Sequence, residues 1–398
     1  MISKIFRLVA VLFFVSNYCE AQPKTWGERI AETIIKTYPD SIVVKKAGEL
    51  VANRPTRWDY EQGVLLKAFD VLGKQTGNNI YFKYTKKIID QFVQPNGSIR
   101  TYEPLDYNID NITPGWVVLD LYRETKEEKY KIAANLLHEQ LVWQPRTKEG
   151  GFWHKHRYPY QMWLDGLYMA GPFSAEYAQM FEVSNDFDDV VNQFIWMESH
   201  VRDNNTGLLY HAWDESKKQR WANPITGQAP GLWGRGMGWY AMAIVDVLDY
   251  LPMNHPKRND LIIILQHLAT ALKKYQDPTS GVWYQVIDKG TVKGNYLEAS
   301  ASCMFVYAFA KGARMGYLDK SFVAIAKKGY EGILNNFIET DNNGLVHLTK
   351  TVSVGGLGGV PYRDGSFEYY ISEPIRTDDL KGVGPFIQAS IEIELMLK

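Results

Sequence analysis

A glycine turn followed by residues of alternating character decides the fold, and its central copy reads Thr206-Gly207-Leu208-Leu209-Tyr210. Four further copies are spread along the chain, at Asn96-Gly97-Ser98-Ile99, Gly150-Gly151-Phe152-Trp153, Ser280-Gly281-Val282-Trp283-Tyr284 and Asn343-Gly344-Leu345-Val346. Glycine supplies the tight turn, and the alternation is typical of a short strand. Because each gap between copies can hold a pair of helices, the spacing predicts a repeat of helix, helix and turn whose units stack.

Between these turns, apolar residues recur at steps of three and four, which is the period of an amphipathic helix. Examples are Val64 to Leu72, Tyr130 to Leu141, Trp239 to Val247 and Ile387 to Leu395. Such patterns predict about twelve helices, and too few strand residues remain for a parallel sheet. The sequence therefore predicts an all-α fold, an (α/α)6 barrel or six-hairpin toroid with short β-hairpins in its loops. Loops at one end would converge on a central cleft.

Composition limits the function. The 398 residues carry a formal net charge of −1, which argues against a nucleic-acid-binding surface. No linker divides the chain, so one domain is expected. The 12 Trp and 25 Tyr residues are many, and a number of them fall in loop-like stretches, where flat rings favour carbohydrate binding.

The N-terminus predicts export. Two early cations precede an apolar run from Leu8 to Val15, and the small residue Ala21 follows. This pattern predicts a signal peptide at residues 1–21 and a single (α/α)6-barrel catalytic domain at residues 22–398, in a periplasmic or secreted protein. The run is too short to span a bilayer, and no other segment predicts a membrane span. Cys19 leaves a lipid-anchored alternative open.

One stretch concentrates aromatic and ionisable residues with glycines, from Glu149 to Met169. Aromatic walls with a few polar groups suit a sugar, whose C–H faces pack on rings while its hydroxyls take hydrogen bonds. Asp165 lies between Trp163 and Tyr168. A carboxyl group among rings is desolvated, which favours its protonated form and suits a proton donor. The residues alone leave open a second interpretation, in which Asp165 is simply a helix N-terminal residue favoured by the helix dipole.

Other motifs predict no cofactor and no metal. His154 and His156 could face one side of a strand as metal ligands, but no third ligand is near them in the sequence. The glycine-rich run at residues 354–359 matches neither a dinucleotide turn nor a phosphate loop. We expect that run to be a mobile loop near the site.

Seven segments then follow one another along the chain: Tyr107-Asn108-Ile109-Asp110-Asn111-Ile112, Gln144-Pro145-Arg146-Thr147, Met162–Met169, His211-Ala212-Trp213-Asp214, Trp233–Trp239, Pro361–Ser366 and Lys381–Gly384. They resemble the unsaturated rhamnogalacturonyl hydrolases of glycoside hydrolase family 105 over nearly the whole mature chain. The resemblance implies an (α/α)6 barrel. It also implies an oligosaccharide substrate, left by a polysaccharide lyase, that ends in a 4,5-unsaturated uronic acid.

The resemblance implies a hydration rather than a direct displacement, so the carboxyl spacing of ordinary glycosidases does not apply. The acid matching Asp165 protonates C4, and water deprotonated by the same carboxylate adds at C5. The resulting hemiketal opens and releases the aglycone. Asp110 matches the second catalytic acid, although a helix N-cap remains possible for it.

Seven further residues are expected to bind the substrate. Arg235 suits the substrate carboxylate, because guanidinium binds carboxylate in a fork. The others are the polar donors His154, Lys155 and His211, and the ring walls Trp163, Trp233 and Trp239. A purely structural histidine remains an alternative for His211.

Three alternatives to a hydrolase that acts on pectin-type rhamnogalacturonan stay open. The same reaction could act on sulfated glucuronyl–rhamnose units from ulvan. An epimerase or isomerase on the same barrel would use His154 and His211 as a proton-abstracting pair. A non-catalytic carbohydrate-binding protein would need the aromatic residues but not Asp165.

Overall fold

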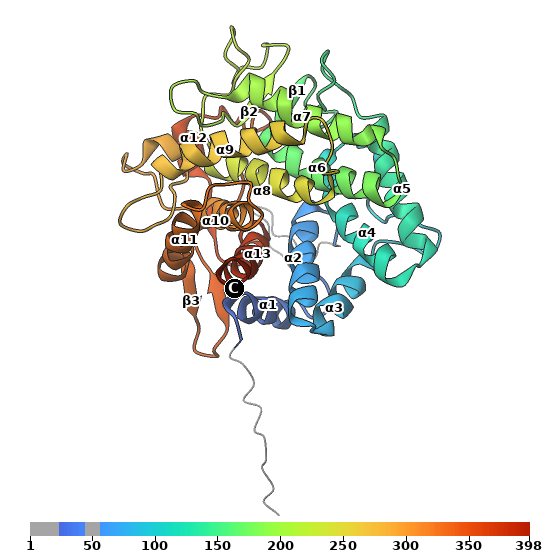
Figure 1. Cartoon of the computed structure of the whole chain (residues 1–398). Coiled ribbons are helices and arrows are strands. Elements are labelled where there is room, and N and C mark those ends of the chain that lie inside the picture. Colours follow the sequence, from blue (N-terminus) through green and yellow to red (C-terminus); the bar gives the residue numbers. More distant parts are fainter. Residues whose placement is uncertain (1–23, 44–55) are drawn as a thin grey trace, which may run out of the picture.

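The computed structural model describes residues 24–43 and 56–398. The predicted signal peptide at residues 1–21 lies outside the described residues. In the described part, helices form two concentric rings around a common axis (Figure 1). The inner helices contact one another in a closed circle, from α2 through α4, α6, α8, α10 and α13 back to α2. The predicted (α/α)6 barrel is therefore confirmed.

Outer and inner helices alternate along the chain. The inner ring comprises α2 (Tyr60–Thr76), α4 (Thr113–Thr125), α6 (Leu164–Met180), α8 (Gly234–Tyr250), α10 (Ala299–Arg314) and α13 (Leu380–Leu397). The outer ring comprises α1 (Trp26–Thr37), α3 (Asn79–Ile89), α5 (Glu128–Val142), α7 (Asn185–Val201), α9 (Arg258–Lys274) and α11 (Phe322–Phe337). The short helices among the described residues are α12 (Phe367–Ser372), η2 (Pro104–Asp106), η3 (Ile109–Ile112) and η4 (Ile287–Lys289).

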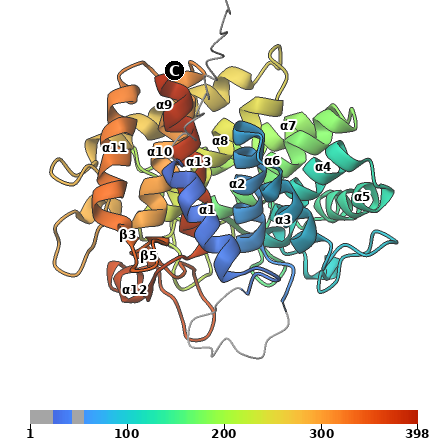
Figure 2. The same ribbon diagram turned by 90° about the horizontal axis from the view of Figure 1, so that it is seen from below.

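Within residues 24–43 and 56–398, three antiparallel strand pairs lie in the loops. They are β1 (Gln161–Trp163) with β2 (Ala212–Asp214), β3 (Ile338–Thr340) with β4 (Val346–Leu348), and β5 (Thr351–Val352) with β6 (Ile375–Arg376). In Figure 2, β3, β5 and α12 gather at one end of the barrel. None of the described helices is both long enough and apolar enough to cross a membrane.

The five predicted glycine turns are present. Their glycines have φ angles between 77° and 107°, which residues with a Cβ rarely adopt. Each turn follows an outer helix and leads toward the next inner helix, so all five lie where inner helices begin. Only the Gly344 copy is flanked by a strand pair, β3 with β4. The copies at Gly97, Gly150 and Gly207 form a single bridge each, so the expected strands are shorter than the alternation suggests.

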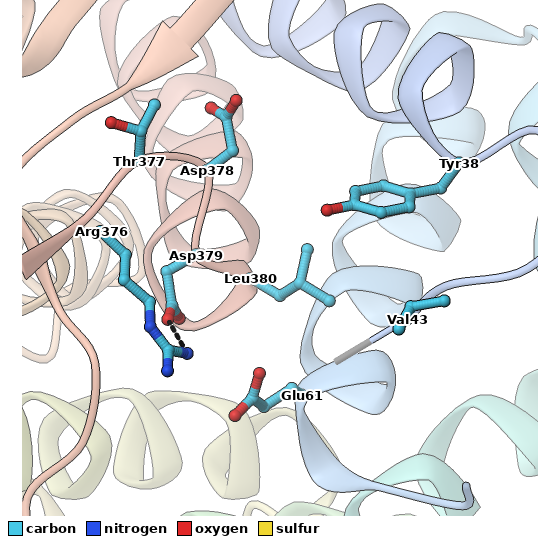
Figure 3. A pocket seen from close by; sticks show the side chains of 8 residues that line it. All are labelled: Tyr38, Val43, Glu61, Arg376, Thr377, Asp378, Asp379 and Leu380. Carbon is cyan, nitrogen blue, oxygen red and sulfur yellow. Dashed lines mark ion pairs between the residues drawn. The ribbon is translucent and has the colours of Figure 1, made fainter. Parts of the chain in front are cut away.

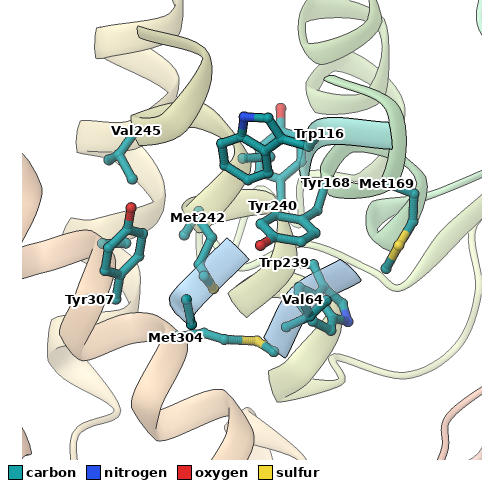
Figure 4. Packing of buried hydrophobic residues seen from close by; sticks show 14 of the residues in the cluster. Val64, Trp116, Tyr168, Met169, Trp239, Tyr240, Met242, Val245, Met304 and Tyr307 are labelled. Carbon is teal, nitrogen blue, oxygen red and sulfur yellow. The ribbon is translucent and has the colours of Figure 1, made fainter. Parts of the chain in front are cut away.

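Aromatic and sulfur-containing side chains fill the centre of the barrel. Figure 4 shows Trp116, Tyr168, Trp239 and Met304, which belong to one buried cluster and come from the neighbouring inner helices α4, α6, α8 and α10. The rings of Tyr168 and Trp239 are 4.6 Å apart between centroids. Such packing fixes the inner helices relative to one another and so holds their N-terminal ends, and whatever side chains these carry, in place.

Candidate active site

A cavity of about 360 Å³ lies where α2, α4 and α6 begin. Three acids line it: Asp59 is the N-cap of α2, Asp110 lies in η3 just before α4, and Asp165 lies in the first turn of α6. Of the predicted site residues it brings together Asp110, Asp165, His154, Lys155 and Trp163, and its other lining residues are Asp59, Tyr60, Glu61, Asn108, Asn111, Arg157, Tyr158, Met169, Ser353, Val354, Gly355, Arg363 and Arg376. Helix N-termini carry positive partial charge, so this end of the barrel favours an anionic ligand.

Asp165 stands in the first turn of α6 and is oriented by His211. The pairing of β1 with β2 brings the two segments together, and the Leu164 amide donates to the His211 carbonyl at 3.0 Å. The Nε2 atom of His211 lies 3.0 Å from Oδ2 of Asp165. No other hydrogen bond to the Asp165 carboxylate occurs among the described residues, so its Oδ1 atom is left for a ligand in the cavity.

The Tyr370 hydroxyl favours one tautomer of His211. This hydroxyl lies 2.8 Å from Nδ1 of the fully buried His211 ring. Burial raises the pKa of the Tyr370 phenol well above its ordinary value, so the hydroxyl keeps its proton and can donate it to Nδ1. In the tautomer that accepts this hydrogen at Nδ1, His211 carries its own hydrogen on Nε2 and donates it to Asp165.

Asp110 is held as a carboxylate on the other side of the cavity. It lies in η3, its Oδ2 atom forms a close ion pair with the Lys155 ammonium, and its Oδ1 atom is 3.2 Å from Nε2 of His154. Burial alone would raise the pKa of Asp110, but Lys155 and His154 together hold it well below its ordinary value. Burial lowers the pKa of His154, which is therefore neutral near pH 7. The cavity thus holds one carboxyl group with a fixed charge, Asp110, and one whose second oxygen is open to a ligand, Asp165.

Trp163 lies in a stack of rings. It is parallel to His154 at 4.8 Å and to Tyr158 at 5.0 Å, with interplanar angles of 7° and 12°. With 5% of its surface exposed, it meets the cavity over a small area rather than with a broad open face. The expected aromatic wall is therefore built by this stack, and Tyr158 is its less buried member.

Four predicted binding residues do not line the cavity. His211 contacts Asp165 instead of lining the cavity itself, and the expected sugar contacts of the other three also need correction. Trp239 is 1% exposed and packs against Tyr168 in the barrel core (Figure 4). Trp233 is also 1% exposed, and it stacks on Tyr370 behind the loop that carries Gly355.

Arg235 is the third of these residues, and it is likewise 1% exposed. Its Nη1 atom donates to the Val352 carbonyl at 2.5 Å and to the Ser300 hydroxyl at 3.4 Å. Arg235 therefore braces β5, the strand that leads directly into the cavity-lining residues Ser353 to Gly355.

The N-terminus of α2 supplies site residues that the sequence did not single out. Asp59 caps this helix, and an acidic cap is indistinguishable in sequence from an acid that faces a ligand. Glu61 lies between the main cavity and a smaller adjoining one (Figure 3). Its Oε1 atom is 2.7 Å from the Lys381 ammonium, which is also 2.9 Å from Asp379. Tyr60, the first residue of α2, also lines the cavity.

The glycine-rich run also reaches the site, as expected, through Val354 and Gly355. No group of three or more His, Cys, Asp or Glu side chains within residues 24–43 and 56–398 is placed to hold a metal ion.

A helical toroid whose cavity holds two carboxyl groups in different environments, together with stacked rings and cations, is typical of one class of protein, the carbohydrate-active enzymes of the (α/α)6 type. The Glycosyl Hydrolase Family 88 model matches residues 26–397. The chain belongs to this family, in the group whose solved structures are labelled family 105. The prediction of an enzyme, a glycoside hydrolase of the unsaturated uronyl hydrolase family, is confirmed.

Three relatives illustrate the match. A family 105 glycoside hydrolase from C. acetobutylicum ATCC 824 is 45% identical, with a TM-score of 0.88 over 94% of this chain and 100% of that chain. Protein Atu3128 of Agrobacterium fabrum is 38% identical over 58% of this chain and all of its own length. The unsaturated rhamnogalacturonyl hydrolase YesR of Bacillus subtilis is 29% identical over 67% of this chain and 75% of its own.

Proposed function

We propose that the enzyme removes the 4,5-unsaturated uronic acid from the non-reducing end of rhamnose-containing oligosaccharides of the rhamnogalacturonan type. The similarity to YesR supports this substrate class. We also propose that a polysaccharide lyase supplies the substrate, because β-elimination is the reaction that leaves a C4=C5 double bond. The observation that carries the proposal is Asp165, which has one oxygen held by His211 and the other open to the cavity.

In the proposed reaction Asp165 acts first as an acid and then as a base. Its protonated carboxyl group gives a proton to C4 of the enol ether, and the positive charge at C5 is shared with the ring oxygen. The resulting carboxylate takes a proton from the water molecule whose oxygen bonds to C5, which restores the acid. The net change is addition of one water molecule, and the hemiketal at C5 opens to release the aglycone. His211 keeps the carboxyl group oriented through both steps.

Asp110 has a different proposed role. Because Lys155 and His154 keep it ionised, it is a poor proton donor and a good acceptor for sugar hydroxyl groups. We therefore assign Asp110 to positioning the unsaturated ring opposite Asp165.

Two features disfavour the epimerase alternative. The His211 ring is fully buried, and both of its nitrogens already have partners, Asp165 and Tyr370. It cannot reach a sugar carbon as one member of a proton-abstracting pair. Membership of a glycoside hydrolase family also argues for hydrolysis.

Export of the protein is a further part of the proposal, and it rests on the sequence of residues 1–21. Expression of the full chain in a Gram-negative host, followed by fractionation and sequencing of the mature N-terminus, tests it. Cleavage after Ala21 supports export, and an uncleaved chain in the cytosolic fraction contradicts it.

The activity is tested with lyase-generated unsaturated oligosaccharides from pectic rhamnogalacturonan and from ulvan, in parallel. The C4=C5 bond conjugated to the carboxylate absorbs ultraviolet light, and hydration removes this absorbance. We expect a loss with the rhamnogalacturonan products, and none with Asp165→Asn, whose circular dichroism should match that of the parent. A loss with the ulvan products alone would reassign the substrate. Retained turnover in Asp165→Asn would contradict the mechanism.

A further inference from the structure

Two arginines at the cavity have no acidic ion-pair partner among the described residues. Arg157 is exposed, and its guanidinium lies over the Tyr158 ring at 5.1 Å. Among the described residues it forms neither a hydrogen bond nor an ion pair, although it lines the cavity. An arginine stacked on an aromatic ring is held in direction while its donors stay available.

Arg363 reaches the same tyrosine from a different loop. Its Nη2 atom is 3.2 Å from the Tyr158 hydroxyl, and its Nε atom donates to the Gly358 carbonyl at 2.9 Å. Main-chain hydrogen bonds between Gly358 and Arg363 in both directions close this loop. A Cβ on Gly356 would lie 2.2 Å from Nη1 of Arg363, so the glycine-rich run makes room for the guanidinium. Within the described structure, neutral groups therefore hold the Arg363 guanidinium in place.

Arg157 and Arg363 differ from Lys155, another cation that lines the cavity, in their charge environment. The charge of Lys155 is matched by Asp110, whereas no carboxylate among the described residues lies within ion-pair distance of Arg157 or Arg363. The Asp165 side chain is 14% exposed at the start of α6, whereas Arg157 is exposed at the rim of the cavity. The terminal ring must reach Asp165, so the rim faces the part of the substrate beyond the scissile bond.

We propose that Arg157 and Arg363, converging on Tyr158, form a subsite for an anionic group, a carboxylate or a sulfate, on the sugars that follow the unsaturated residue. This inference rests on the proposed function and deepens it, because it selects oligosaccharides with a second negative charge. Guanidinium groups bind both anions through paired hydrogen bonds, so the subsite chemistry is shared by uronate and sulfate.

The test compares three substrates that share the same unsaturated end. One is an unsaturated uronyl–rhamnose disaccharide, uncharged beyond the linkage. The second carries a sulfate on its rhamnose, and the third is a tetrasaccharide with a second uronate. The measured quantity is the ratio of kcat/KM for each charged substrate to that for the neutral disaccharide, at low and at high ionic strength. The variants are Arg157→Gln, Arg363→Gln and Arg363→Lys, with Arg29→Gln as the matched control.

Arg29 is a suitable control because it also stacks on a ring, that of Trp26 at 4.2 Å, but belongs to the outer helix α1. We expect the parent to prefer a charged substrate, and salt to weaken this preference. The ratio should fall about two- to fivefold in Arg157→Gln, as for an exposed ion pair, and about tenfold in Arg363→Gln, as for a charge-assisted hydrogen bond. Arg363→Lys should recover part of the loss, and Arg29→Gln should match the parent.

Whether the sulfated disaccharide or the tetrasaccharide shows the larger effect tells which anion the subsite takes. Equal losses on neutral and charged substrates would overturn the inference, because they would assign the arginines to the carboxylate of the unsaturated ring. An unchanged ratio in Arg157→Gln, which is exposed and should fold normally, would also overturn it. If the parent hydrates none of the substrates, the proposed function fails. Calorimetric binding of the same three sugars to the parent and to Arg157→Gln still tests the subsite in that case.

Discussion

Glu61 allows a quantitative test of the electrostatics beside the cavity. Its carboxylate shares the Lys381 ammonium with Asp379, at 2.7 and 2.9 Å respectively (Figure 3 shows both acids). Burial raises the pKa of Glu61 from 4.5 to about 7, and the like charges of Asp379 and Asp59 add to the effect while Lys381 opposes it. The folded protein therefore holds a proton on Glu61 that the unfolded chain releases at lower pH.

Because folding and proton binding to Glu61 are linked, the raised pKa makes the free energy of unfolding depend on pH. Below pH 4.5 Glu61 is protonated in both states, and its contribution to stability is fully present. As pH rises toward 7, the unfolded chain ionises first, and stability falls by 1.36 kcal/mol for each unit of pKa difference. Between pH 5 and pH 8 this loss is about 2–3 kcal/mol. Glu61→Gln mimics the protonated side chain, so its free energy of unfolding should escape that part of the decline.

Urea denaturation of both proteins at pH 5 and pH 8 measures the difference. We expect the variant to gain about 2–3 kcal/mol on the parent between the two pH values. The control is Glu128→Gln, on the outer helix α5, whose side chain is 66% exposed. Parallel pH dependence in the parent and Glu61→Gln would refute the idea that Glu61 takes up a proton on folding near neutral pH.

The remaining predictions concern the two carboxyl groups of the cavity. In Lys155→Met, Asp110 loses the positive charge that contributes most to lowering its pKa, so this pKa should rise by about 1–3 units. As a result, kcat/KM should fall at acidic pH values where the parent is still active. Profiles of kcat/KM against pH that superimpose after scaling would contradict this. In Tyr370→Phe, His211 loses its Nδ1 partner and its fixed tautomer, so kcat should fall about fivefold, the value of one hydrogen bond, with little change in KM. Steady-state kinetics on the unsaturated disaccharide measures both, and an unchanged kcat in Tyr370→Phe would show that the tautomer is fixed in some other way.

The fold could be predicted from the sequence because its repeat is local. Each glycine turn and each helical face is encoded within about 20 residues, so their order along the chain already implies stacked pairs. The strands were harder to predict. The pairing of β1 with β2 joins residues 161–163 to residues 212–214 across α6 and α7, and no local pattern records such a contact.

The site was predictable where several unusual residues crowd together and less so where one residue stands on a regular helix. His154, Lys155, Trp163 and Asp165 lie in one short stretch, and all four line the cavity. Trp239 follows three closely spaced glycines, Gly234, Gly236 and Gly238, but it also belongs to a helical apolar pattern with Met242 and Val247. In the folded protein Trp239 packs as this apolar pattern predicts, and its ring lies in the core.

Asp165 and Glu298 show why one sequence position supports both a structural and a catalytic interpretation. Glu298 caps α10, and its carboxylate accepts hydrogen bonds from the Ser300 and Ala301 amides and from the Val352 amide, so no oxygen is left for a ligand. Asp165 stands at the equivalent end of α6 and is also favoured by the helix dipole, but its one hydrogen bond within the described structure comes from His211. The two interpretations of Asp165 are therefore compatible. The helix N-terminus provides the place for an acid, and the unsatisfied oxygen, which the sequence cannot show, distinguishes a group that can react from one that only caps.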